Sequence, residues 1–597
     1  MPDGSSSTAD ASFSGATTSI SISLRILATT DLHMHLGSEA RRGGLARLAP
    51  LIAAQRRAHA NLLLFDNGDL LDGTPLADEL ARAGLGPHDV HPAIAALNRL
   101  GYDAATLGNH DFTHGVDFLR RALADARYPL VVANAGLLQG APLWAETALL
   151  RRRMIATNGQ PQDIAIGVFG VLPPQTVEWE AGLAQELTTE DIVTASRRAV
   201  SGLRARGADV IVALSHGGPG DGQQHRAENA ADAIAGIAGV NAVIAGHTHE
   251  VMARPGTAQA APLVTAGYAG THLAAITLSL SGHPGTWQIN ATAAEAMAAP
   301  TDRDTPELIP PPPPASTRHL HAPIGRIREA LSSHFALLGT DSGLRLTEAA
   351  LRQHIATQLP DSPLPVLVAL APFRTGGRGG PEYFVDIPAG TFRRSDLSTL
   401  YPFTNHAAVI EVTGTDLSEW LERAASAFSH LPSPGAPAPL LDDTIPGFNL
   451  DMIAGLDYEI DLCRPAAFDG NGRRRAATGR VGPILYRGRP VQPDQRFLLV
   501  TNSYRMTGGP LYADLTRSRP CQLPPPARIR IRDIIARFIA SGGTADTYGQ
   551  PFFRLRAAPG TEAWFDTAPE ADPAACPIPV RGRHIAKDGF QRLFLAL

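Results

Sequence analysis

Metal-binding residue types follow five apolar segments in the first half of the chain, and each segment reads as a buried β-strand. Imidazole, carboxylate and amide donors together suit borderline divalent ions such as Zn²⁺ and Mn²⁺, whereas an all-oxygen set would favour Mg²⁺ or Ca²⁺. A carboxylate that bridges two such cations suits displacement at phosphorus, and Asp69 is the natural candidate. The sequence therefore predicts a two-metal hydrolase. In chain order the donors are Asp31 and His33, Asp66 and Asp69, Asn109, His110 and Asp111, His216, and His247 and His249.

Each of these signals is modest when taken alone. Asn109 tolerates turn conformations, and His216 would also serve as the cap of the Gly-Gly turn that follows it. The pairs Asp31/His33 and His247/His249 are spaced two residues apart, so extended backbone would turn both members of a pair the same way. We therefore expect each pair to offer two ligands together. The metal interpretation depends on all five motifs standing at strand ends within one half of the chain.

The elements that must position these residues alternate between strands and helices. Apolar residues recur at helical spacing between the metal-bearing strands, which predicts an α/β fold, and the last strands of this half should be antiparallel. In an open α/β sheet, ligands bind at the carboxyl ends of the strands, so five such ends would converge on one crevice. The predicted helices are 47–60, 90–101, 117–128 and 193–207, and the predicted antiparallel strands lie in 263–282 and 286–296.

A chain of 597 residues exceeds the usual size of one domain. The proline run at 310–314 cannot continue a helix or a central strand and marks a boundary. A second region of strands and helices starts near 365–372. The predicted organisation is a tail at 1–23, a first domain at 24–300, a Pro-rich linker and connecting helix at 301–360 with 317–357 helical, and a second domain at 361–597.

Composition excludes several functional classes. The net charge of −5 argues against a broad basic surface for polymeric nucleic acid, and no apolar run reaches the length of a membrane span, so no membrane insertion is expected. Three cysteines at wide spacing form no CxxC metal motif, and a disulfide between two of them is possible. The first 23 residues lack the basic and apolar regions of a secretory signal and resemble a disordered tail.

The order DLH, GD, GNH, H and GHTH resembles the calcineurin-like metallophosphatases. APFRTGGRGG, TLYPFTN and TNSYRMTGG resemble the substrate domain of the bacterial 5'-nucleotidase superfamily, and NGDLLDGTPLAD and GFNLDMIAGLDYEIDL favour its 2',3'-cyclic-nucleotide 2'-phosphodiesterase/3'-nucleotidase branch. The resemblance covers residues 24–597. It implies a four-layered calcineurin-like sandwich followed by a C-terminal α+β domain of the 5'-nucleotidase type.

The resemblance also implies two divalent metal ions, Mn²⁺, Zn²⁺ or Co²⁺. Metal coordination lowers the pKa of bound water to about 7, so no Ser or Cys nucleophile is needed. His110 would contact the transferring phosphoryl group and stabilise its charge. One metal would be held by Asp31, His33, Asp69 and His249, and the other by Asp69, Asn109, His216 and His247.

One position departs from the family pattern. In 5'-nucleotidases an Asp three residues after the catalytic His orients it, whereas this chain has Thr113 there. The cyclic phosphodiesterase branch tends to lack that Asp, so Thr113 favours this branch but leaves the partner of His110 undetermined. We expect Asp111 to be structural and Asp66 to fix the loop that presents Asp69.

The second domain is expected to bind substrate. Arg374 and Arg378 stand in a Gly-rich turn, where guanidinium groups grip phosphate oxygens. Tyr401 and Tyr504 match the aromatic pair that sandwiches the nucleobase in this family, and stacking tolerates any base. The competing interpretation is two solvated loop arginines and two buried core tyrosines. Because these residues stand in the second domain and the metal ligands in the first, the active site should lie between the domains. Related enzymes close by domain rotation, which implies the same motion here.

The favoured reaction converts 2',3'-cyclic nucleotides to 3'-nucleotides and then to nucleoside and phosphate. The alternatives are a 5'-nucleotidase or UDP-sugar hydrolase on the same scaffold, and a non-catalytic nucleotide-binding protein. The expected partners are small-molecule nucleotides, and the chain is expected to be a monomer. The absence of a signal favours a cytoplasmic location, whereas the resemblance favours the periplasm.

Overall fold

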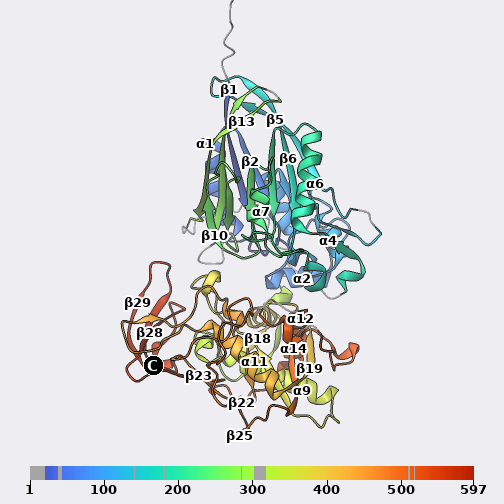
Figure 1. Cartoon of the computed structure of the whole chain (residues 1–597). Coiled ribbons are helices and arrows are strands. Elements are labelled where there is room, and N and C mark those ends of the chain that lie inside the picture. Colours follow the sequence, from blue (N-terminus) through green and yellow to red (C-terminus); the bar gives the residue numbers. More distant parts are fainter. Residues whose placement is uncertain are drawn as a thin grey trace, which may run out of the picture.

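The computed structural model of the chain describes residues 20–37, 43–139, 142–179, 182–283, 285–300, 318–507, 511–516 and 518–597. The first and second halves of the sequence form separate parts, blue to green and yellow to red in Figure 1. The predicted tail, apart from residues 20–23 in the first strand, and the proline run lie outside the described residues.

Two sheets form the centre of the first part. One has the strand order β13-β12-β1-β2-β3 and the other β10-β11-β9-β8-β6-β5. Alternate residues of a strand face opposite sides of its sheet, and here the facing sides share one buried apolar core that includes Ile26, Phe65, Val168 and Val212. The strands are β1 Ile20–Thr29, β2 Leu62–Asp66, β3 Ala104–Ala105, β5 Thr147–Ile155, β6 Pro161–Val171, β8 Val210–Ser215, β9 Ala242–Ala245, β10 Val251–Arg254, β11 Leu263–Ala266, β12 His272–Gly282 and β13 Gln288–Ala298.

Helices cover the outer faces of both sheets. Residues of α1, α3 and α4 pack in one outer core, and residues of α6 and α7 pack in another. The resulting order of helices, sheet, sheet and helices is the predicted four-layered sandwich (Figure 1). The predicted helices and the antiparallel pairing of β12 with β13 are confirmed. The helices are α1 Leu45–Ala58, α2 Pro75–Ala83, α3 Pro92–Leu100, α4 Val116–Leu123, α5 Thr176–Trp179, α6 Ile192–Ala205 and α7 Ala231–Ala235.

The second part is built on a four-stranded sheet of order β19-β26-β16-β21. β16 and β26 are parallel, and the outer strands are antiparallel to them, which gives the predicted α+β character. A further sheet, β20-β28-β30-β29, stands near the end of the chain. The main elements are α9 Ser342–Gln358, β16 Val366–Leu370, α10 Arg394–Leu400, β19 Ala407–Thr413, α11 Gly414–Ala424, β20 Ala438–Pro439, β21 Met452–Ala454, β26 Arg496–Asn502, α12 Ser503–Thr507, α14 Ile531–Ala540, β28 Glu562–Thr567, β29 Val580–Ile585 and β30 Gln591–Ala596.

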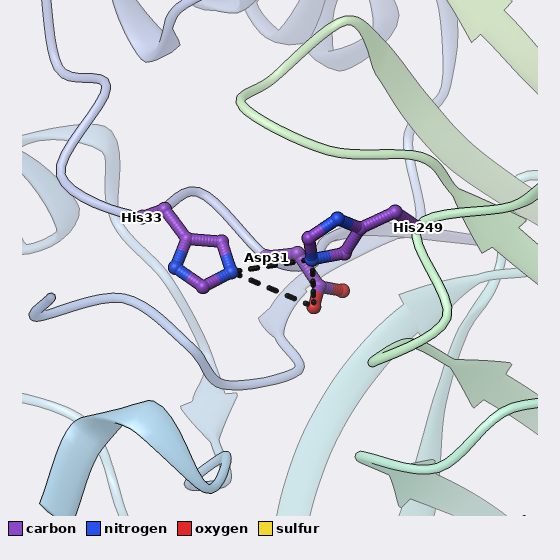
Figure 2. Close-up of side chains that lie close together, drawn as sticks. All are labelled: Asp31, His33 and His249. Carbon is purple, nitrogen blue, oxygen red and sulfur yellow. Dashed lines mark hydrogen bonds and ion pairs between the residues drawn. The ribbon is translucent and has the colours of Figure 1, made fainter. Parts of the chain in front are cut away.

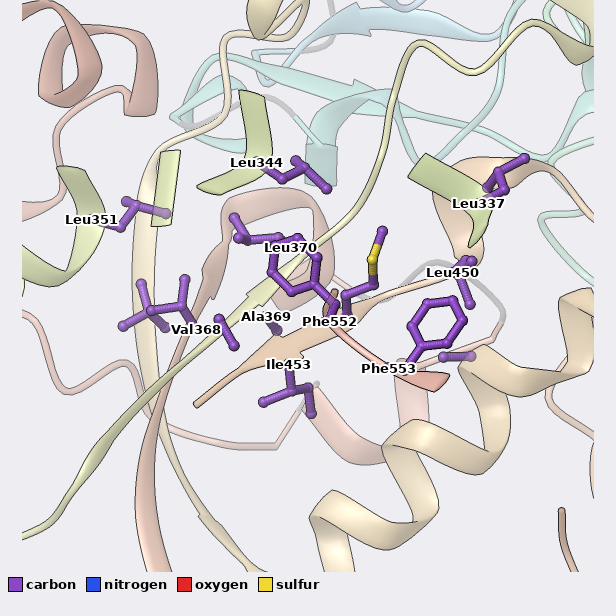
Figure 3. Close-up of a cluster of buried hydrophobic side chains, with 14 of the residues drawn as sticks. Leu337, Leu344, Leu351, Val368, Ala369, Leu370, Leu450, Ile453, Phe552 and Phe553 are labelled. Atoms are coloured by element: carbon purple, nitrogen blue, oxygen red, sulfur yellow. The ribbon is translucent and has the colours of Figure 1, made fainter. Parts of the chain in front are cut away.

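The segment predicted as a connecting helix differs from expectation. Residues 317–357 were expected to be helical, but β14 Pro323–Ile327 and β15 Leu331–Ser332 come before α9, and they pair with β18 Gly390–Arg393 and β17 Asp386–Ile387. α9 also contributes Leu344 and Leu351 to the core of the second part, beside Val368 and Leu370 of β16 (Figure 3). We propose that the second domain begins near residue 318 rather than 361.

The N-terminus of α9 gives a stability prediction. Asp341 is buried and accepts a hydrogen bond from the backbone N–H of Leu344 at 2.8 Å, and burial raises its pKa to about 7. The folded state holds this proton more tightly than the unfolded chain does. Deprotonation of the carboxyl therefore lowers the stability as pH rises from about 4, its ordinary pKa, to about 7, its pKa in the folded state. Asp341→Asn keeps the cap acceptor and removes the charge.

In urea denaturation, the variant should gain about 2 kcal/mol in unfolding free energy, relative to the parent, between pH 5 and pH 8. Asp191→Asn serves as a matched control, because Asp191 caps α6 but is more exposed and its pKa is lowered rather than raised. Parallel pH profiles for the parent and Asp341→Asn would contradict the prediction.

Helices of the two parts pack together close to the carboxyl ends of the first part's strands. α10 packs on α2, and α12 packs on α5. The Asp78 carboxylate of α2 accepts hydrogen bonds from Ser398 and from the Arg532 guanidinium of the second part. Among the described residues, no helix combines the length and the apolar composition that crossing a membrane requires.

Candidate metal centre

The predicted ligands stand just beyond the carboxyl ends of five strands. Asp31 and His33 follow β1, and Asp69 follows β2. β1, β2, and the short β3 are neighbours in one sheet, and β8 and β9 are neighbours in the other. Parallel strands end at the same edge of a sheet, so the two sheets bring these residues to one place. Asn109 and His110 follow β3, His216 follows β8, and His247 and His249 follow β9.

The backbone at these positions is not extended. Asp31, His33, Asp69, His247 and His249 all have positive φ, between 44° and 70°. Left-handed backbone is uncommon for residues with a Cβ and is found at functional sites, where the surrounding structure supports the strain. The expectation of extended backbone at these pairs was therefore wrong. Asp31 and His33 still join one group of donors, whereas His247 and His249 join different groups.

Asp31, His33 and His249 form the first donor group (Figure 2). The Nε2 atoms of the two imidazoles are 3.3 Å apart. The Oδ1 atom of Asp31 lies 3.5 Å from Nε2 of His249 and 4.0 Å from Nε2 of His33. This spacing is that of donor atoms arranged around a common point.

Asp69, His216 and His247 form the second donor group, whose ligand atoms lie within 4.8 Å of one another. Oδ2 of Asp69 lies 3.1 Å from Nε2 of His216 and 3.5 Å from Nε2 of His33, so Asp69 stands between the two groups. Among the described residues, Oδ2 of Asp69, Oδ1 of Asn109 and Nε2 of His216 are buried without a hydrogen-bond partner. Buried polar atoms almost always have a hydrogen-bond partner, so three potential metal ligands that lack one are consistent with a cation site.

The electrostatics of the centre also favour cations. Burial alone would lower the pKa of His216, but the charges of Asp69 and Asp31 raise it to about 10. Burial alone would raise the pKa of Asp69, but His216 and His110 hold it well below its ordinary value. A site that stabilises an added proton so strongly carries excess negative potential, which divalent cations would neutralise.

Neighbouring groups fix the imidazoles. The Nδ1–H of His33 donates to the carbonyl of Asp72 at 2.9 Å, and the Nδ1–H of His216 donates to the carbonyl of Asn67 at 2.8 Å. With the proton on Nδ1, the unprotonated Nε2 atom of each ring is available as a metal ligand toward the centre. Nε2 of His247 instead contacts Glu228 at 2.8 Å, so Nδ1 is the atom of His247 available to a metal.

Asp111 has the structural position expected of it. Its carboxylate accepts hydrogen bonds from the backbone N–H groups of Gly108, Asp69, Leu70 and Leu71, at 2.8 to 3.0 Å. These bonds fix the loop that presents Asp69. Asp66 assists, because its carboxylate accepts from the backbone N–H of Gly68. A Cβ at Gly108 would lie 2.2 Å from Oδ1 of Asp69, which is why glycine stands there.

His110 lies beside the second donor group. Its backbone N–H donates to Oδ1 of Asp69 at 2.8 Å. Its ring stacks on Phe403 of the second domain, with centroids 6.2 Å apart and planes at 25°. The side chain remains about one quarter exposed, so the imidazole is within reach of a ligand that enters between the domains.

The substrate residues predicted in the second domain come from one edge of its sheet. Arg374 and Arg378 follow the parallel strand β16, and Tyr504 follows the parallel strand β26. The Arg374 guanidinium lies 4.7 Å from the centre of the Tyr383 ring. Arg378 donates to the carbonyl of Thr248 and pairs with Glu250 at 3.1 Å, which links the Gly-rich turn to the loop that carries His247 and His249.

Tyr401 does not have the exposure that stacking on a base requires. It is 3% exposed, packs edge-on against Phe373 at 5.1 Å and belongs to the core of the second domain, so the competing core interpretation holds for it. Arg532 donates to the carbonyls of Tyr401 and Pro402 and fixes this turn. Phe403, two residues later, is the half-buried ring that faces His110. Tyr504 is half-buried.

Three residues that lie at the site were not identified from the sequence, namely Phe403, Tyr268 and Glu228. The ring of Tyr268 lies 4.5 Å from that of His249, and its hydroxyl is 3.1 Å from Nε2 of His35. The motif TLYPFTN contains Phe403, but spacing alone does not tell which of its two rings is exposed. Tyr268 and Glu228 stand in loops without a distinguishing pattern.

Two family models match the chain. The calcineurin-like phosphoesterase model matches residues 24–251, and the 5'-nucleotidase C-terminal domain model matches residues 368–517. The chain is 33% identical to the 2',3'-cyclic-nucleotide 2'-phosphodiesterase/3'-nucleotidase of Salmonella typhimurium, over 82% of each chain. It is 30% identical, over 93% of its length, to the trifunctional nucleotide phosphoesterase protein YfkN of Bacillus subtilis, but it spans 40% of that longer protein.

A solved structure shows the same two-part fold. The putative 5'-nucleotidase from Staphylococcus aureus matches with a TM-score of 0.66 at 21% identity, over 89% of this chain and 100% of that one. At this identity the similarity concerns the fold, whereas the Salmonella relative carries the family assignment.

Proposed function

Because the chain belongs to the bacterial 5'-nucleotidase superfamily of calcineurin-like phosphoesterases, we propose that it is a 2',3'-cyclic-nucleotide 2'-phosphodiesterase and 3'-nucleotidase. Membership of this superfamily makes it a metal-dependent hydrolase that acts on nucleotides. The main structural support for a metal site is the Oδ2 atom of Asp69, which lies between the two groups of donors and is buried without a hydrogen-bond partner. The names of relatives at 31–33% identity and Thr113 in place of an Asp support the cyclic branch.

The donors present fit two divalent cations. When bound, the cations supply an activated water and neutralise charge on the phosphoryl group. The mixed imidazole and carboxylate set suits Mn²⁺, Zn²⁺ or Co²⁺. We assign Asp31, His33, Asp69 and His249 to one ion and Asp69, Asn109, His216 and His247 to the other, in agreement with the two donor groups.

The chain's own residues would then orient and stabilise the reacting phosphate. In the first step, water adds at phosphorus and the P–O2' bond breaks, which leaves the 3'-nucleotide. In the second step, water adds again and the P–O3' bond breaks, which releases nucleoside and phosphate. His110 would donate a hydrogen bond to a phosphoryl oxygen as negative charge develops there. Its partly exposed side chain and its backbone contact with Asp69 support this role.

The second domain would hold the nucleoside. Tyr504 and Phe403 offer rings for the base, and Arg374 and Arg378 offer guanidinium groups for phosphate oxygens. In this structure Arg378 is paired with Glu250, so a substrate phosphate would have to compete with that carboxylate. Any base presents a face for stacking, so a broad nucleotide range is expected.

Tyr504→Ala should raise KM for 2',3'-cyclic AMP by about 10-fold, because base stacking contributes about 1–3 kcal/mol. The kcat should stay within about threefold, since the ring touches no reacting atom. Steady-state kinetics would measure both values. Tyr486→Ala is the control. Tyr486 lies in β24 Leu485–Tyr486, which pairs with other strands than those at the site, and its ring packs on Phe497 near the start of β26, at the far end of that strand from Tyr504. An unchanged KM for Tyr504→Ala would exclude stacking.

Product analysis tests the proposed reaction. The Mn²⁺-loaded protein is incubated in parallel with 2',3'-cyclic AMP, 3'-AMP and 5'-AMP, and products are separated by chromatography. Transient 3'-AMP followed by adenosine is expected. Release of phosphate from 5'-AMP alone would place the chain among the 5'-nucleotidases, and bound metal without hydrolysis of any nucleotide would favour the non-catalytic alternative. The predicted monomeric state stays a prediction.

A further inference from the structure

Asp72 occupies a distinctive place next to the centre. It stands in the loop between Asp69 and α2 and is 5% exposed. Its Oδ1 atom lies 3.1 Å from Nε2 of His114, and its Oδ2 atom lies 3.9 Å from Nδ1 of His110. One buried carboxylate therefore contacts two histidines, and its second oxygen lies within ion-pair distance of the ring that we place at the phosphoryl group.

His110 needs a group that sets its orientation. An imidazole that donates from one nitrogen is held in the correct tautomer and direction by an acceptor at the other nitrogen. Three residues after His110 stands Thr113, which directly follows the short helix His110–Phe112 and carries no carboxylate. Among the described residues, Asp72 places a carboxylate oxygen in ion-pair contact with Nδ1 of His110, at 3.9 Å.

We propose that Asp72 is the positioning residue of His110. This inference rests on the role of His110 in the proposed function. In the working geometry the Nδ1–H of His110 donates to Oδ2 of Asp72, which directs Nε2–H toward the substrate. The separation of 3.9 Å must shorten by about 1 Å, and such contacts commonly tighten only when substrate is bound.

The surroundings of Asp72 support this assignment. His114 holds the other oxygen of the carboxylate, so the direction of Oδ2 is fixed. The His110 ring also stacks on Phe403, whose turn is held by Arg532. His110 thus contacts Phe403 of the second domain, and His33 and Asp72 of its own domain. The Asp72 carboxylate supplies a hydrogen-bond acceptor that can select a tautomer.

Asp72→Asn should lower kcat by about 10- to 100-fold while KM stays within about threefold, the effect expected for a group that orients a functional imidazole. Metal content and the melting temperature should match the parent. Asp117→Asn is the control, because Asp117 is an exposed carboxylate in the first turn of α4. If Asp72→Asn fails to fold or loses metal, Asp72→Gln takes its place in every comparison.

A double-mutant cycle separates positioning from general support. If Asp72 acts through His110, then Asp72→Asn lowers kcat of the parent but has almost no effect in a His110→Ala background. Equal fold-losses in both backgrounds, or no loss in the parent, overturn the proposal. A parent that hydrolyses no nucleotide refutes the proposed function instead, so the two failures are distinguishable.

A relocated carboxylate gives a second test. Side chains three residues apart eclipse in a 3₁₀ helix, so an Asp at position 113 would lie on the same side as His110. Adding Thr113→Asp to Asp72→Asn should recover at least about 10-fold in kcat. Recovery would show that His110 requires a carboxylate at Nδ1. A further loss with intact metal content would contradict the positioning role of Asp72.

Discussion

Asp69→Asn is expected to lower kcat for both 2',3'-cyclic AMP and 3'-AMP by about 1,000-fold or more. Asp69 stands between the two donor groups, with Oδ2 at 3.1 Å from Nε2 of His216 and 3.5 Å from Nε2 of His33. An amide lacks the charge that holds two cations together, and metal ions contribute several kcal/mol to such reactions. The loss should affect both steps equally, because one site serves both.

The same variant has a well-defined structural control. Asp163→Asn changes an exposed carboxylate of β6 in the same domain and should leave turnover unchanged. Circular dichroism and thermal unfolding would show that Asp69→Asn is folded. A folded Asp69→Asn protein with parental activity, under controlled metal concentrations, would refute the assignment of the metal ligands.

His110→Ala is expected to lower kcat by about 100- to 1,000-fold, because it removes a donor aimed at the phosphoryl group where charge develops. The backbone N–H of residue 110 would still donate to Oδ1 of Asp69, so the donor groups should stay intact. Two metal ions per chain should therefore remain bound. Steady-state kinetics together with metal analysis would measure both quantities.

His225→Ala serves as the control for His110→Ala, because His225 is an exposed histidine of the same domain. A kcat close to that of the parent would show that His110 has no catalytic role. A loss of metal together with activity would instead make His110 part of the support of the ligands.

The position of the centre could be predicted because its signal is local. Each ligand follows an apolar run of strand length, and parallel strands must end at one edge, so the motifs around Asp31, Asp69 and His216 indicate both the fold and the site. The pairing of β12 with β13 was predictable for the same reason, since the two strands are adjacent in the chain.

Conformation at the ligands could not be read from spacing. The left-handed backbone of His247 and His249 is sustained by tertiary contacts, such as the bond from the backbone N–H of His247 to Asp31. Residues distant in sequence provide these contacts. The two-residue spacing alone could not show that the two imidazoles turn toward different groups of donors; their assignment to different metals came from the family resemblance.

The second domain shows the same limit. Tyr401 and Phe403 are two residues apart in one turn, and the backbone of that turn is held by bonds from the distant Arg532. The strands β14 and β15 are short and pair with β18 and β17 much later in the chain, so neither has the long alternating pattern that marks a strand. Long-range partners, rather than local composition, fix these features.

Metal stoichiometry tests the two-cation centre most directly. The parent and Asp69→Asn would each be stripped of metal with a chelator, loaded with Mn²⁺ and desalted. Elemental mass spectrometry would then measure the number of Mn²⁺ ions per chain. We expect two ions per parent chain, lost in parallel with activity on chelation and restored by Mn²⁺, and fewer than two in Asp69→Asn. A parent that binds no metal, or that hydrolyses nucleotides equally well without it, would contradict the centre.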